Sequence, residues 1–292
     1  MQRVNAHVRS FAPEHWGEVE FFKIFYGGSH KLKPDNVKAL GGISGHFHKA
    51  LILRELAVDL LPALEIDEQE LYANGHTAAR HGSKFAAVVE GIFTELYSAI
   101  ECARKIISDI YVKAQGLPSD STRKFFRKIQ SGEVGSGFPD KLKEIVRSCD
   151  WYEELRVIRD ELTHADVGHC SLERNTGHVQ YSHFGARMNG QCYVIPDVMG
   201  RIEKFFEQVN QFLGTTFNFL NSQLQPTEVN QLCGFFFGRG YLRKLPLERP
   251  INFHTGTCVS LEWFEKEEGF RCPFADDCGA YHKAKTINAL HE

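Results

Sequence analysis

One long apolar pattern, over residues 83–113, sets the strongest constraint on how this chain can fold. Its apolar side chains recur every three or four positions, which is the spacing that places them on one broad stripe of an α-helix. A stripe of this width predicts a helix with one face buried against other elements. Its members are Phe85, Val88, Val89, Ile92, Phe93, Leu96, Ala99, Ile100, Ala103, Ile106, Ile107 and Ile110.

Two further segments, one on each side of this helix, show helical patterns of their own. In residues 46–65 the apolar positions have helical spacing, and Pro62 is expected to kink or end that helix. Residues 122–130 predict a short basic helix that Ser119 or Ser121 can cap.

Two more helices flank a predicted β-hairpin. Pro139 suits the first turn of a long helix that runs to about residue 165, and Asp197 opens an amphipathic helix that continues to about residue 225. Between them, the alternating residues 178–184 and 191–195 predict the hairpin. The middle of the chain is therefore predicted to be a bundle of three long helices and one short one, interrupted by this hairpin.

The chain as a whole is predicted to be mainly α, in three parts. Residues 1–45 mix aromatics with Gly and Pro without a sustained period, which indicates short strands and loops. They belong to an N-terminal mixed segment, residues 1–80, that is expected to pack on the helical domain of residues 81–225. Residues 226–292 are rich in Gly, aromatics and clustered cysteines, and we expect them to form a small Cys/His-rich appendage.

The overall charge and the cysteine usage exclude some classes of protein. A net charge of -3 argues against a protein that coats nucleic acid along its whole surface, although it permits a local basic cleft. No apolar run is long enough to span a bilayer, and the start of the chain lacks the apolar core of an export signal. The 8 cysteines therefore do not suggest a disulfide framework, and a reducing cytoplasmic setting without membrane attachment is expected.

Residues 159–164, with the sequence RDELTH, combine a guanidinium, a carboxylate and an imidazole on one predicted helix. Asp160 and His164 are four apart and share a face, so the carboxylate can orient the imidazole as a general base. Arg159 offers a charged, planar fork for phosphate oxygens. Arg159 and His164 are five apart and diverge by about 140° around the helix. One site therefore requires a bend at the helix end or a second subunit.

This segment resembles the Arg-polar-x3-His motif of the HEPN superfamily, at Arg159, Asp160 and His164. The resemblance covers about residues 80–225 and implies an antiparallel helical bundle with an inserted β-hairpin. It also implies a metal-independent endoribonuclease whose two subunits bring their motifs together at a homodimer interface. The RNA 2′-hydroxyl would be the nucleophile, and no cofactor would be required for catalysis. Family members of the toxin or anti-phage defence kind suggest an antitoxin or activator protein as a further partner.

A plainer interpretation of the same segment stays open. Arg156, Arg159, Asp160 and Glu161 would then form a solvated, ion-paired face, with His164 near a helix C-terminus. Glu101 and Arg104 can face the same pocket, although an exposed polar face is the favoured interpretation for them. The imidazoles of His169, His178 and His183 suggest either a metal site or an ordinary hairpin surface.

The C-terminal cysteines have the spacing of a metal site, C-x5-C-x3-H, over residues 272–282. Three cysteines with one histidine are an accepted ligand set for structural zinc. The segment resembles the CCCH zinc-finger family, in which aromatics such as those at Phe274 and Tyr281 stack on single-stranded RNA. The first spacer is longer than in that family, so His254 and Cys233 remain substitutes for one ligand. The alternative is free thiols and an unrelated histidine. The predicted Zn²⁺ ligands are Cys258, Cys272, Cys278 and His282.

Two groups of basic residues are candidates for contact with RNA. One lies on the short basic helix, and the other follows the aromatic run of residues 235–237 near Tyr241. The aromatics themselves are also explained as core residues. A catalytically inactive HEPN-like module that binds RNA or a protein, with the zinc segment as its recognition element, is the second functional hypothesis. The candidate RNA-binding residues are Arg123, Lys124, Arg127, Lys128, Arg239, Arg243 and Lys244.

Overall fold

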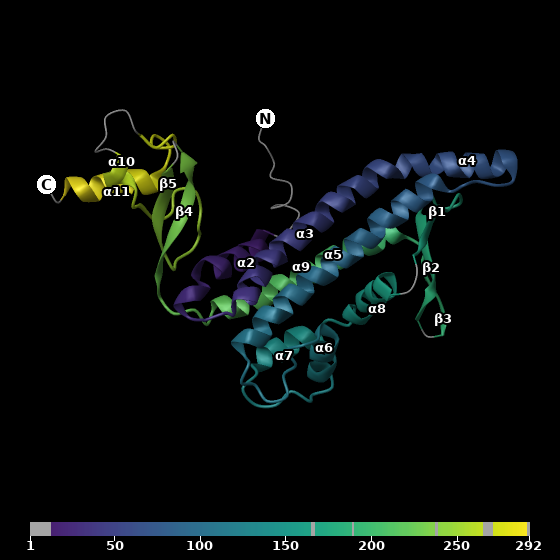
Figure 1. Ribbon diagram of the computed structural model, residues 1–292, viewed down its shortest axis with the longest axis horizontal. Coiled ribbons are helices and arrows are strands. Elements are labelled where there is room, and N and C mark those ends of the chain that lie inside the picture. Colours follow the sequence, from purple (N-terminus) through teal and green to yellow (C-terminus); the bar gives the residue numbers. More distant parts are fainter. Residues whose placement is uncertain (1–12, 165–166, 189, 237–238, 265–270, 291–292) are drawn as a thin grey trace. The chain divides into compact units, whose positions relative to one another are not determined.

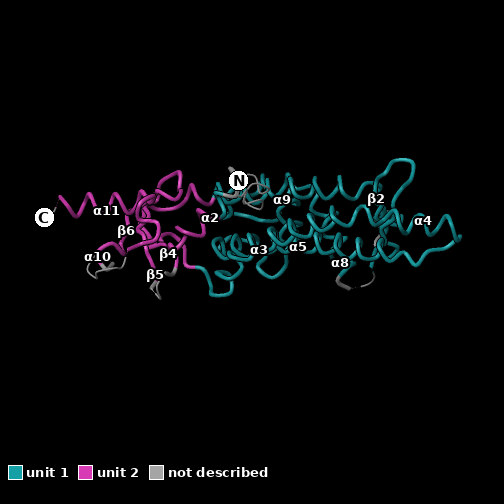
Figure 2. The backbone as a smooth tube through the Cα atoms, turned by 90° about the horizontal axis from the view of Figure 1, so that it is seen from above, with its two compact units in different colours: residues 1–19, 32–219 teal, residues 20–31, 220–292 magenta. Residues whose placement is uncertain are grey.

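A computed structural model describes residues 13–164, 167–188, 190–236, 239–264 and 271–290. The chain is mainly helical, with 59% helix and 13% strand, which confirms the predicted class. It divides into two compact units, shown in Figure 2: unit 1 comprises residues 1–19 and 32–219, and unit 2 comprises residues 20–31 and 220–292. None of the described helices is both long enough and apolar enough to cross a bilayer.

The helices and strands follow one another along the chain as Figure 1 labels them. The helices are α2 (Pro13–Phe25), α3 (Pro34–Leu60), α4 (Leu64–Asn74), α5 (Arg80–Ile110), α6 (Thr122–Gln130), α7 (Asp140–Arg147), α8 (Tyr152–His164), α9 (Val198–Asn221), α10 (Leu261–Phe264) and α11 (Gly279–Ala289), with 3-10 turns at Tyr26–Gly28 and Leu61–Ala63. The strands are β1 (His169–Leu172), β2 (Val179–Met188), β3 (Gln191–Ile195), β4 (Glu228–Phe236), β5 (Arg239–Pro246) and β6 (Thr257–Cys258).

Helix α5 is the predicted long helix, and its apolar stripe is the core of unit 1. Helix α3 runs along it, and α4, α6, α8 and β1 also contact it (Figure 1). Helix α9 joins the core through aromatic rings: Phe205 meets Phe93 edge-on at 5.8 Å. These contacts bury every apolar position of the predicted stripe except Val88 and Ile110, which are half-buried.

The helix predicted over residues 46–65 is part of a longer one. Helix α3 ends at Leu60, a 3-10 turn contains Pro62, and α4 starts at Leu64, so the predicted break at the proline is confirmed. The interpretation of residues 1–45 as short strands and loops is wrong for residues 13–25 and 34–45, which are helical; residues 1–12 lie outside the described residues.

Glycines explain why the start of α3 showed no helical pattern. A methyl group at Gly42 would lie 3.0 Å from the sulfur of Cys102 on α5. In the other direction, a methyl group at Gly91 of α5 would lie 3.0 Å from a Leu53 methyl of α3. The two helices thus approach closely where side chains are missing. Glycine lowers the helical propensity of this segment, and the close packing of α3 on α5 that glycine permits offsets this loss.

The long helix predicted from Pro139 to about residue 165 is in fact two helices, α7 and α8. The break lies at residues 148–151, where Cys149 and Trp151 are both buried. The Ser148 hydroxyl donates to the Ile145 carbonyl at 2.8 Å, and this bond satisfies a carbonyl at the end of α7. Burial of Trp151 outweighs continuation of the helix, so the Arg159 segment lies on a helix of 13 residues.

The predicted hairpin is present and is part of a three-stranded antiparallel sheet in the order β1-β2-β3. Strand β2 extends through Met188, beyond its predicted end, and a register irregularity lies between His183 and Arg187. Strand β1, which was not predicted, pairs Cys170 with Tyr181. Its place is set by close contact with α5, because a methyl group at Gly82 would lie 2.5 Å from the Cys170 carbonyl oxygen.

Unit 2 contains a second antiparallel sheet, in the order β4-β5-β6, together with α10 and α11. Strands β4 and β5 form a hairpin with an irregularity between Leu232 and Gly234. A small buried hydrophobic cluster of unit 2 consists of Leu261, Ala275, Cys278, Ala280, Tyr281 and Ala284.

Replacement of Asp67 by alanine is expected to destabilise unit 1 through the start of α5. The Asp67 carboxylate accepts from the backbone N–H groups of His81 at 2.8 Å and Gly82 at 2.7 Å. Loss of such a cap costs about 1 kcal/mol. The midpoint of thermal unfolding should therefore fall by about 2–4 °C in Asp67→Ala. The control is Asp59→Ala at an exposed position of α3, and equal midpoints for both variants would contradict the capping role.

Candidate functional site

Helix α8 packs against α5 and carries the Arg159 segment. Tyr152, Leu155 and Ile158 are buried apolar residues of α8, and they follow the spacing of a helix with one face in the core. At its start, the Tyr152 ring stacks on Phe126 of α6 at 3.7 Å and 7°. The short basic helix α6 is thereby fixed beside the first turn of α8.

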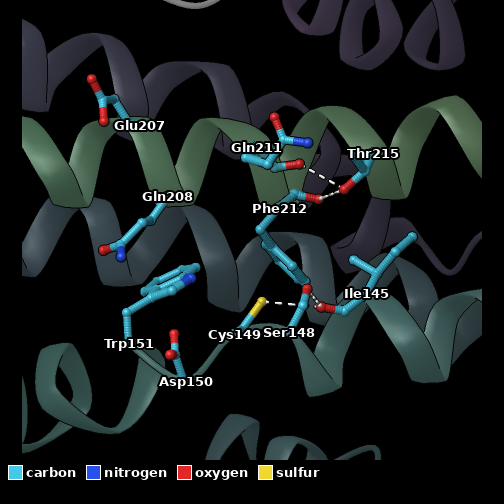
Figure 3. Close-up of a pocket in the computed structure, with 10 residues that line it drawn as sticks. All are labelled: Ile145, Ser148, Cys149, Asp150, Trp151, Glu207, Gln208, Gln211, Phe212 and Thr215. Carbon is cyan, nitrogen blue, oxygen red and sulfur yellow. Dashed lines mark hydrogen bonds between the residues drawn. The ribbon is translucent and has the colours of Figure 1, made fainter.

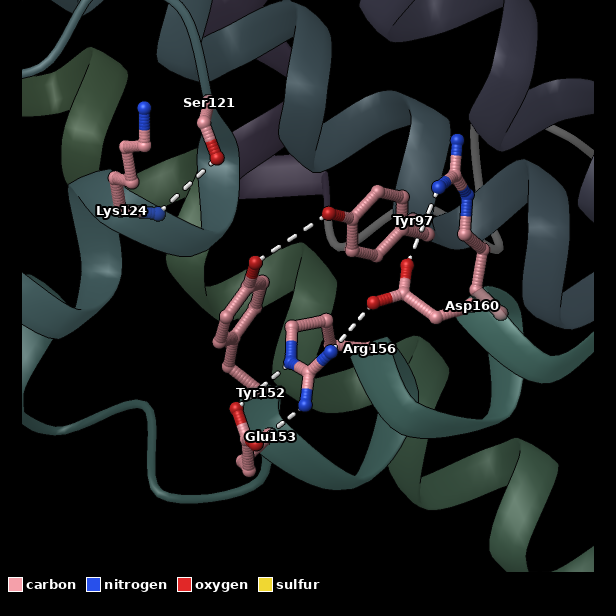
Figure 4. Close-up of polar contacts among 8 residues, drawn as sticks. Tyr97, Ser121, Lys124, Tyr152, Glu153, Arg156 and Asp160 are labelled. Atoms are coloured by element: carbon pink, nitrogen blue, oxygen red, sulfur yellow. Dashed lines mark hydrogen bonds and ion pairs between the residues drawn. The ribbon is translucent and has the colours of Figure 1, made fainter. Parts of the chain in front are cut away.

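An ion-paired network runs along α8, as Figure 4 shows. Arg156 is buried and donates to Glu153 through Nε at 2.9 Å and Nη2 at 2.6 Å. Its Nη1 donates to Asp160. The hydrogen bonds from Arg156 lower the pKa of Glu153, and the same bonds raise the pKa of Arg156. Both groups therefore stay charged across the physiological range.

Arg159 is held by two neighbours, Asp160 and Tyr97. Its Nη1 donates to the other carboxylate oxygen of Asp160 at 3.2 Å, and its Cζ lies 4.8 Å from the centre of the Tyr97 ring. Tyr97 is a buried residue of α5 and contacts the Tyr152 hydroxyl at 3.4 Å. The Arg159 side chain keeps 28% exposure, so an anion in solution can reach it.

The Asp160 carboxylate lies between two arginines. One oxygen accepts from Arg156 and the other from Arg159, and the predicted contact of Asp160 with His164 stays a prediction. Asp160 is therefore a positioning group for two arginines. The backbone of α8 is helical through His164, whose side chain lies outside the described residues. Arg159 and His164 thus occupy positions about 140° apart on one helix.

A second group of titratable residues lies where α5 meets the first sheet. Glu90 accepts from the Gly168 N–H at 2.5 Å and from the Tyr181 hydroxyl at 3.1 Å. Burial raises the pKa of Glu90, against the opposing effect of these bonds and of nearby His183 and His169. His183 is buried beside Tyr181, so it is a core residue and not part of a hairpin surface.

His178, another of the three histidines considered as metal ligands, is exposed and lies 3.8 Å from the Asp197 carboxylate. Among the described residues, no three His, Cys, Asp or Glu side chains are placed to hold a metal. His169, His178 and His183 are therefore not brought together as ligands.

A cavity of about 500 Å³ lies between the turn at residues 148–151, just before α8, and α9 (Figure 3). Asp150 and Glu207 contribute carboxylates to its lining, and Cys149 contributes a thiol. Burial raises the pKa of Cys149 to about 12, so this thiol is protonated and is a poor nucleophile. Arg159 and Asp160 do not line the cavity, and it is separate from the site on α8.

The basic residues of α6 lie beside the network on α8. Phe125, Phe126 and Ile129 are the buried face of α6, while Arg123, Lys124 and Arg127 are exposed. The charge of Arg123 also contributes to the lowered pKa of Glu153, which places it near the start of α8. Lys124 pairs with Asp120 at 2.8 Å, and Ser121 caps the helix as predicted, accepting from the Lys124 N–H at 3.2 Å.

Glu101 and Arg104 take different places from those expected. Arg104 is buried; its Nη1 donates to the Ser119 carbonyl at 2.5 Å, and burial lowers its pKa. Glu101 pairs with Lys105 at 3.2 Å. Both line a cavity of about 770 Å³ with Lys33 and Asp109, apart from the residues that hold Arg159. The exposed polar face expected for Arg104 is therefore wrong.

The remaining candidate residues lie in unit 2. Lys244 is exposed and pairs with Glu228 at 2.5 Å, and the side chain of Arg239 lies outside the described residues. Among the aromatics, Tyr241 and Tyr281 are buried, so they are core residues and not stacking platforms, whereas Phe274 is exposed. The side chains of residues 235–237 lie outside the described residues.

Two members of the site, Tyr97 and Glu90, were not found from the sequence. Both lie on α5, within or beside its apolar stripe. At such positions a tyrosine suggests a core residue, and a glutamate suggests a residue at the edge of the stripe. Their partners, Arg159 and Gly168, are distant in sequence, so no local spacing could have indicated them.

Comparison with family models, with curated proteins and with solved structures finds no match for this chain. The inferences below therefore rest on the residues and their geometry.

The raised pKa of Glu90 predicts a pH dependence of stability. The folded protein binds a proton at Glu90 more tightly than the unfolded chain does. The free energy of unfolding therefore falls as the pH rises from the ordinary glutamate pKa of 4.5 through the raised pKa of the folded state. Glu90→Gln removes the titrating carboxyl group, so this loss of stability is absent. The midpoint of thermal unfolding of Glu90→Gln minus that of the wild type should therefore be larger at pH 7 than at pH 4. Glu65→Gln, at an exposed position of α4, is the control, and a pH-independent difference for Glu90→Gln would refute the assignment.

Proposed function

We propose that this protein is a metal-independent endoribonuclease that acts through Arg159 and His164 on α8. The observation that carries the proposal is the setting of Arg159. It is fixed by Asp160 and Tyr97, is partly exposed, and lies on the helix that ends at His164. A guanidinium that is held by its neighbours and stays partly exposed can bind a phosphate with little loss of conformational freedom.

The proposed reaction needs only groups that RNA and this site supply. His164 removes the proton from a ribose 2′-hydroxyl, whose oxygen attacks the adjacent phosphorus. The bond from phosphorus to the 5′-oxygen breaks, and the leaving oxygen takes up a proton. The products are a 2′,3′-cyclic phosphate and a 5′-hydroxyl. Arg159 stabilises the charge that develops on the phosphoryl oxygens, and positioning supplies much of the remaining rate.

A second subunit solves the geometric problem posed by α8. Residues 159 and 164 diverge by about 140° around one straight helix, so a single phosphate cannot readily meet both from the same copy. A two-fold axis beside α8 would bring Arg159 of one protomer toward His164 of its partner. We therefore propose a homodimer with a composite site.

The exposed basic face of α6 supports RNA as the substrate. Arg123, Lys124 and Arg127 lie on it, and α6 is fixed to the start of α8 by the stack of Phe126 on Tyr152. The resemblance to HEPN proteins suggests a toxin or anti-phage defence effector, with an antitoxin or activator protein as the regulating partner.

A second candidate function is an inactive RNA- or protein-binding module. The exposed rings of Phe253 and Phe274 in unit 2 favour it, because they meet edge-on at 5.8 Å and present apolar surface to which bases can stack.

Cleavage of RNA should persist in EDTA, leave 2′,3′-cyclic phosphate ends and spare DNA, which lacks the 2′-hydroxyl. His164→Ala should lower the rate by about 10²–10⁴-fold, because it removes the general base. The assay is incubation of the purified full chain with mixed cellular RNA, followed by analysis of the product ends.

The matched control for this assay is His76→Ala, which removes an exposed imidazole at the end of α4. It should cleave like the wild type. Strict dependence on Mg²⁺, or equal cutting of DNA, would rule out the 2′-hydroxyl mechanism. If the wild type binds RNA but leaves it intact, the binding-module alternative is favoured.

Mixing two inactive variants tests the composite site. When Arg159→Ala and His164→Ala chains are refolded together, about half of the dimers contain one of each, and these carry one intact Arg159 and one intact His164. The mixture should regain cleavage that neither variant shows alone. If the mixture stays inactive although light scattering shows dimers, the two residues act within one chain. An active wild type that is monomeric at assay concentration would exclude the dimer.

A further inference from the structure

Four cysteines from separate segments of unit 2 line one small cavity of about 110 Å³. They come from β4, from β6, from the segment before α11 and from the N-cap position of α11. Arg243 and Phe253 also line the cavity. The members of this four-cysteine cluster are Cys233, Cys258, Cys272 and Cys278.

The register of the second sheet explains why Cys233 belongs to the cluster. Arg243 of β5 pairs with Gln231 of β4 on one side and with Cys258 of β6 on the other, so these three residues share a face. The hydrogen bond from Arg243 Nε to the Cys233 sulfur, at 3.0 Å, places the Cys233 side chain on that same face. The irregularity between Leu232 and Gly234 falls at Cys233, which leaves it without a paired residue on β5.

Arg243 is fixed among the thiols. Its Nη1 donates to the carbonyls of Phe253 at 2.7 Å and Thr255 at 3.2 Å. Its Nε donates to the Cys233 sulfur at 3.0 Å, and its Nη2 lies 3.9 Å from the Cys278 sulfur. Arg243 therefore directs positive charge at two sulfurs of the cluster.

The two predicted histidines are engaged elsewhere. The Nε2 of His282 is 2.8 Å from the Asp276 carbonyl, and the residue is exposed and does not line the cavity. The Nδ1 of His254 accepts from the Gly279 N–H at 3.2 Å. The predicted set of Cys258, Cys272, Cys278 and His282 is therefore not the set that the cavity brings together.

We propose that the four-cysteine cluster is a structural zinc site, with Cys233 in the place expected for His282. Four sulfurs satisfy the tetrahedral preference of Zn²⁺. Among the described residues, no three His, Cys, Asp or Glu side chains are placed to hold a metal, so the proposed site requires the cysteine side chains to change rotamer around the ion. Each thiol releases its proton to solvent as its sulfur binds the metal. The excess negative charge of four thiolates around Zn²⁺ is the reason for Arg243 at this position.

Metal content of the full chain, purified without chelator, tests the ligand set. The wild type should contain about one zinc per chain. His282→Ala and the control Cys192→Ser, an exposed cysteine of unit 1, should keep it, while Cys233→Ser should lose most of it. Retention of zinc by Cys233→Ser together with its loss in His282→Ala would overturn the proposal in favour of the CCCH set.

A spectrum of the wild type keeps the test decisive if Cys233→Ser fails to fold. Cobalt(II) in place of zinc should show the ligand-field bands of a tetrahedral site and the charge-transfer intensity of four thiolates. A spectrum of three sulfurs and one nitrogen, the absence of bound zinc and of cobalt uptake, or disulfides among the four cysteines by mass spectrometry would each refute the site. These measurements do not involve RNA cleavage, so their failure is distinct from failure of the proposed nuclease.

Discussion

Burial of α5 is the constraint on which the rest of unit 1 depends. Its apolar stripe was evident in the sequence, but the helix is enclosed further than the stripe alone, because Glu95, Tyr97 and Arg104 are also buried. A buried charge is tolerated only with partners. Burial alone would raise the pKa of Glu95, but Lys49, at 2.5 Å, and His46, at 2.6 Å, hold it below its ordinary value. The polar residues of α5 thus fix α3 and the loop before α6 in place.

The sequence predicted those elements whose signal is local. The stripe of α5, the cap of α6 at Ser121 and the alternation in β2 and β3 each depend on neighbouring residues, and all three are present. The early part of α3 shows no helical pattern because Gly42 is needed for close contact with α5, which is distant in sequence. The break before α8 was missed because burial of Trp151 depends on the tertiary fold. Strand β1 exists through its contact with α5, which periodicity cannot reveal.

The same division applies to the candidate sites. Arg159 and Asp160 were found from their spacing, but their geometry was not, because Tyr97 and Arg156 decide it. A carboxylate shared by two arginines reduces the net charge around Arg159. It also holds the Arg159 guanidinium at a defined angle, and charge that is fixed in advance in this way would suit the proposed reaction. Cys233 was only a substitute ligand in the sequence, because a strand irregularity, and not a spacing rule, directs it to the other three cysteines.

The small size of the hydrophobic cluster around α11 would give the four-cysteine cluster a structural purpose. Three of the six residues in that hydrophobic cluster are alanines, and Cys258 and Cys272 pack against it half-buried. A cluster of this kind buries little apolar surface, so it contributes little against the entropy of ordering the segments around it. A metal bound by β4, β6 and the start of α11 would join segments that hydrophobic contacts alone hold weakly. The cysteines would then hold these segments together through the metal. Arg243, on the middle strand of the sheet, would balance the negative charge of their thiolates.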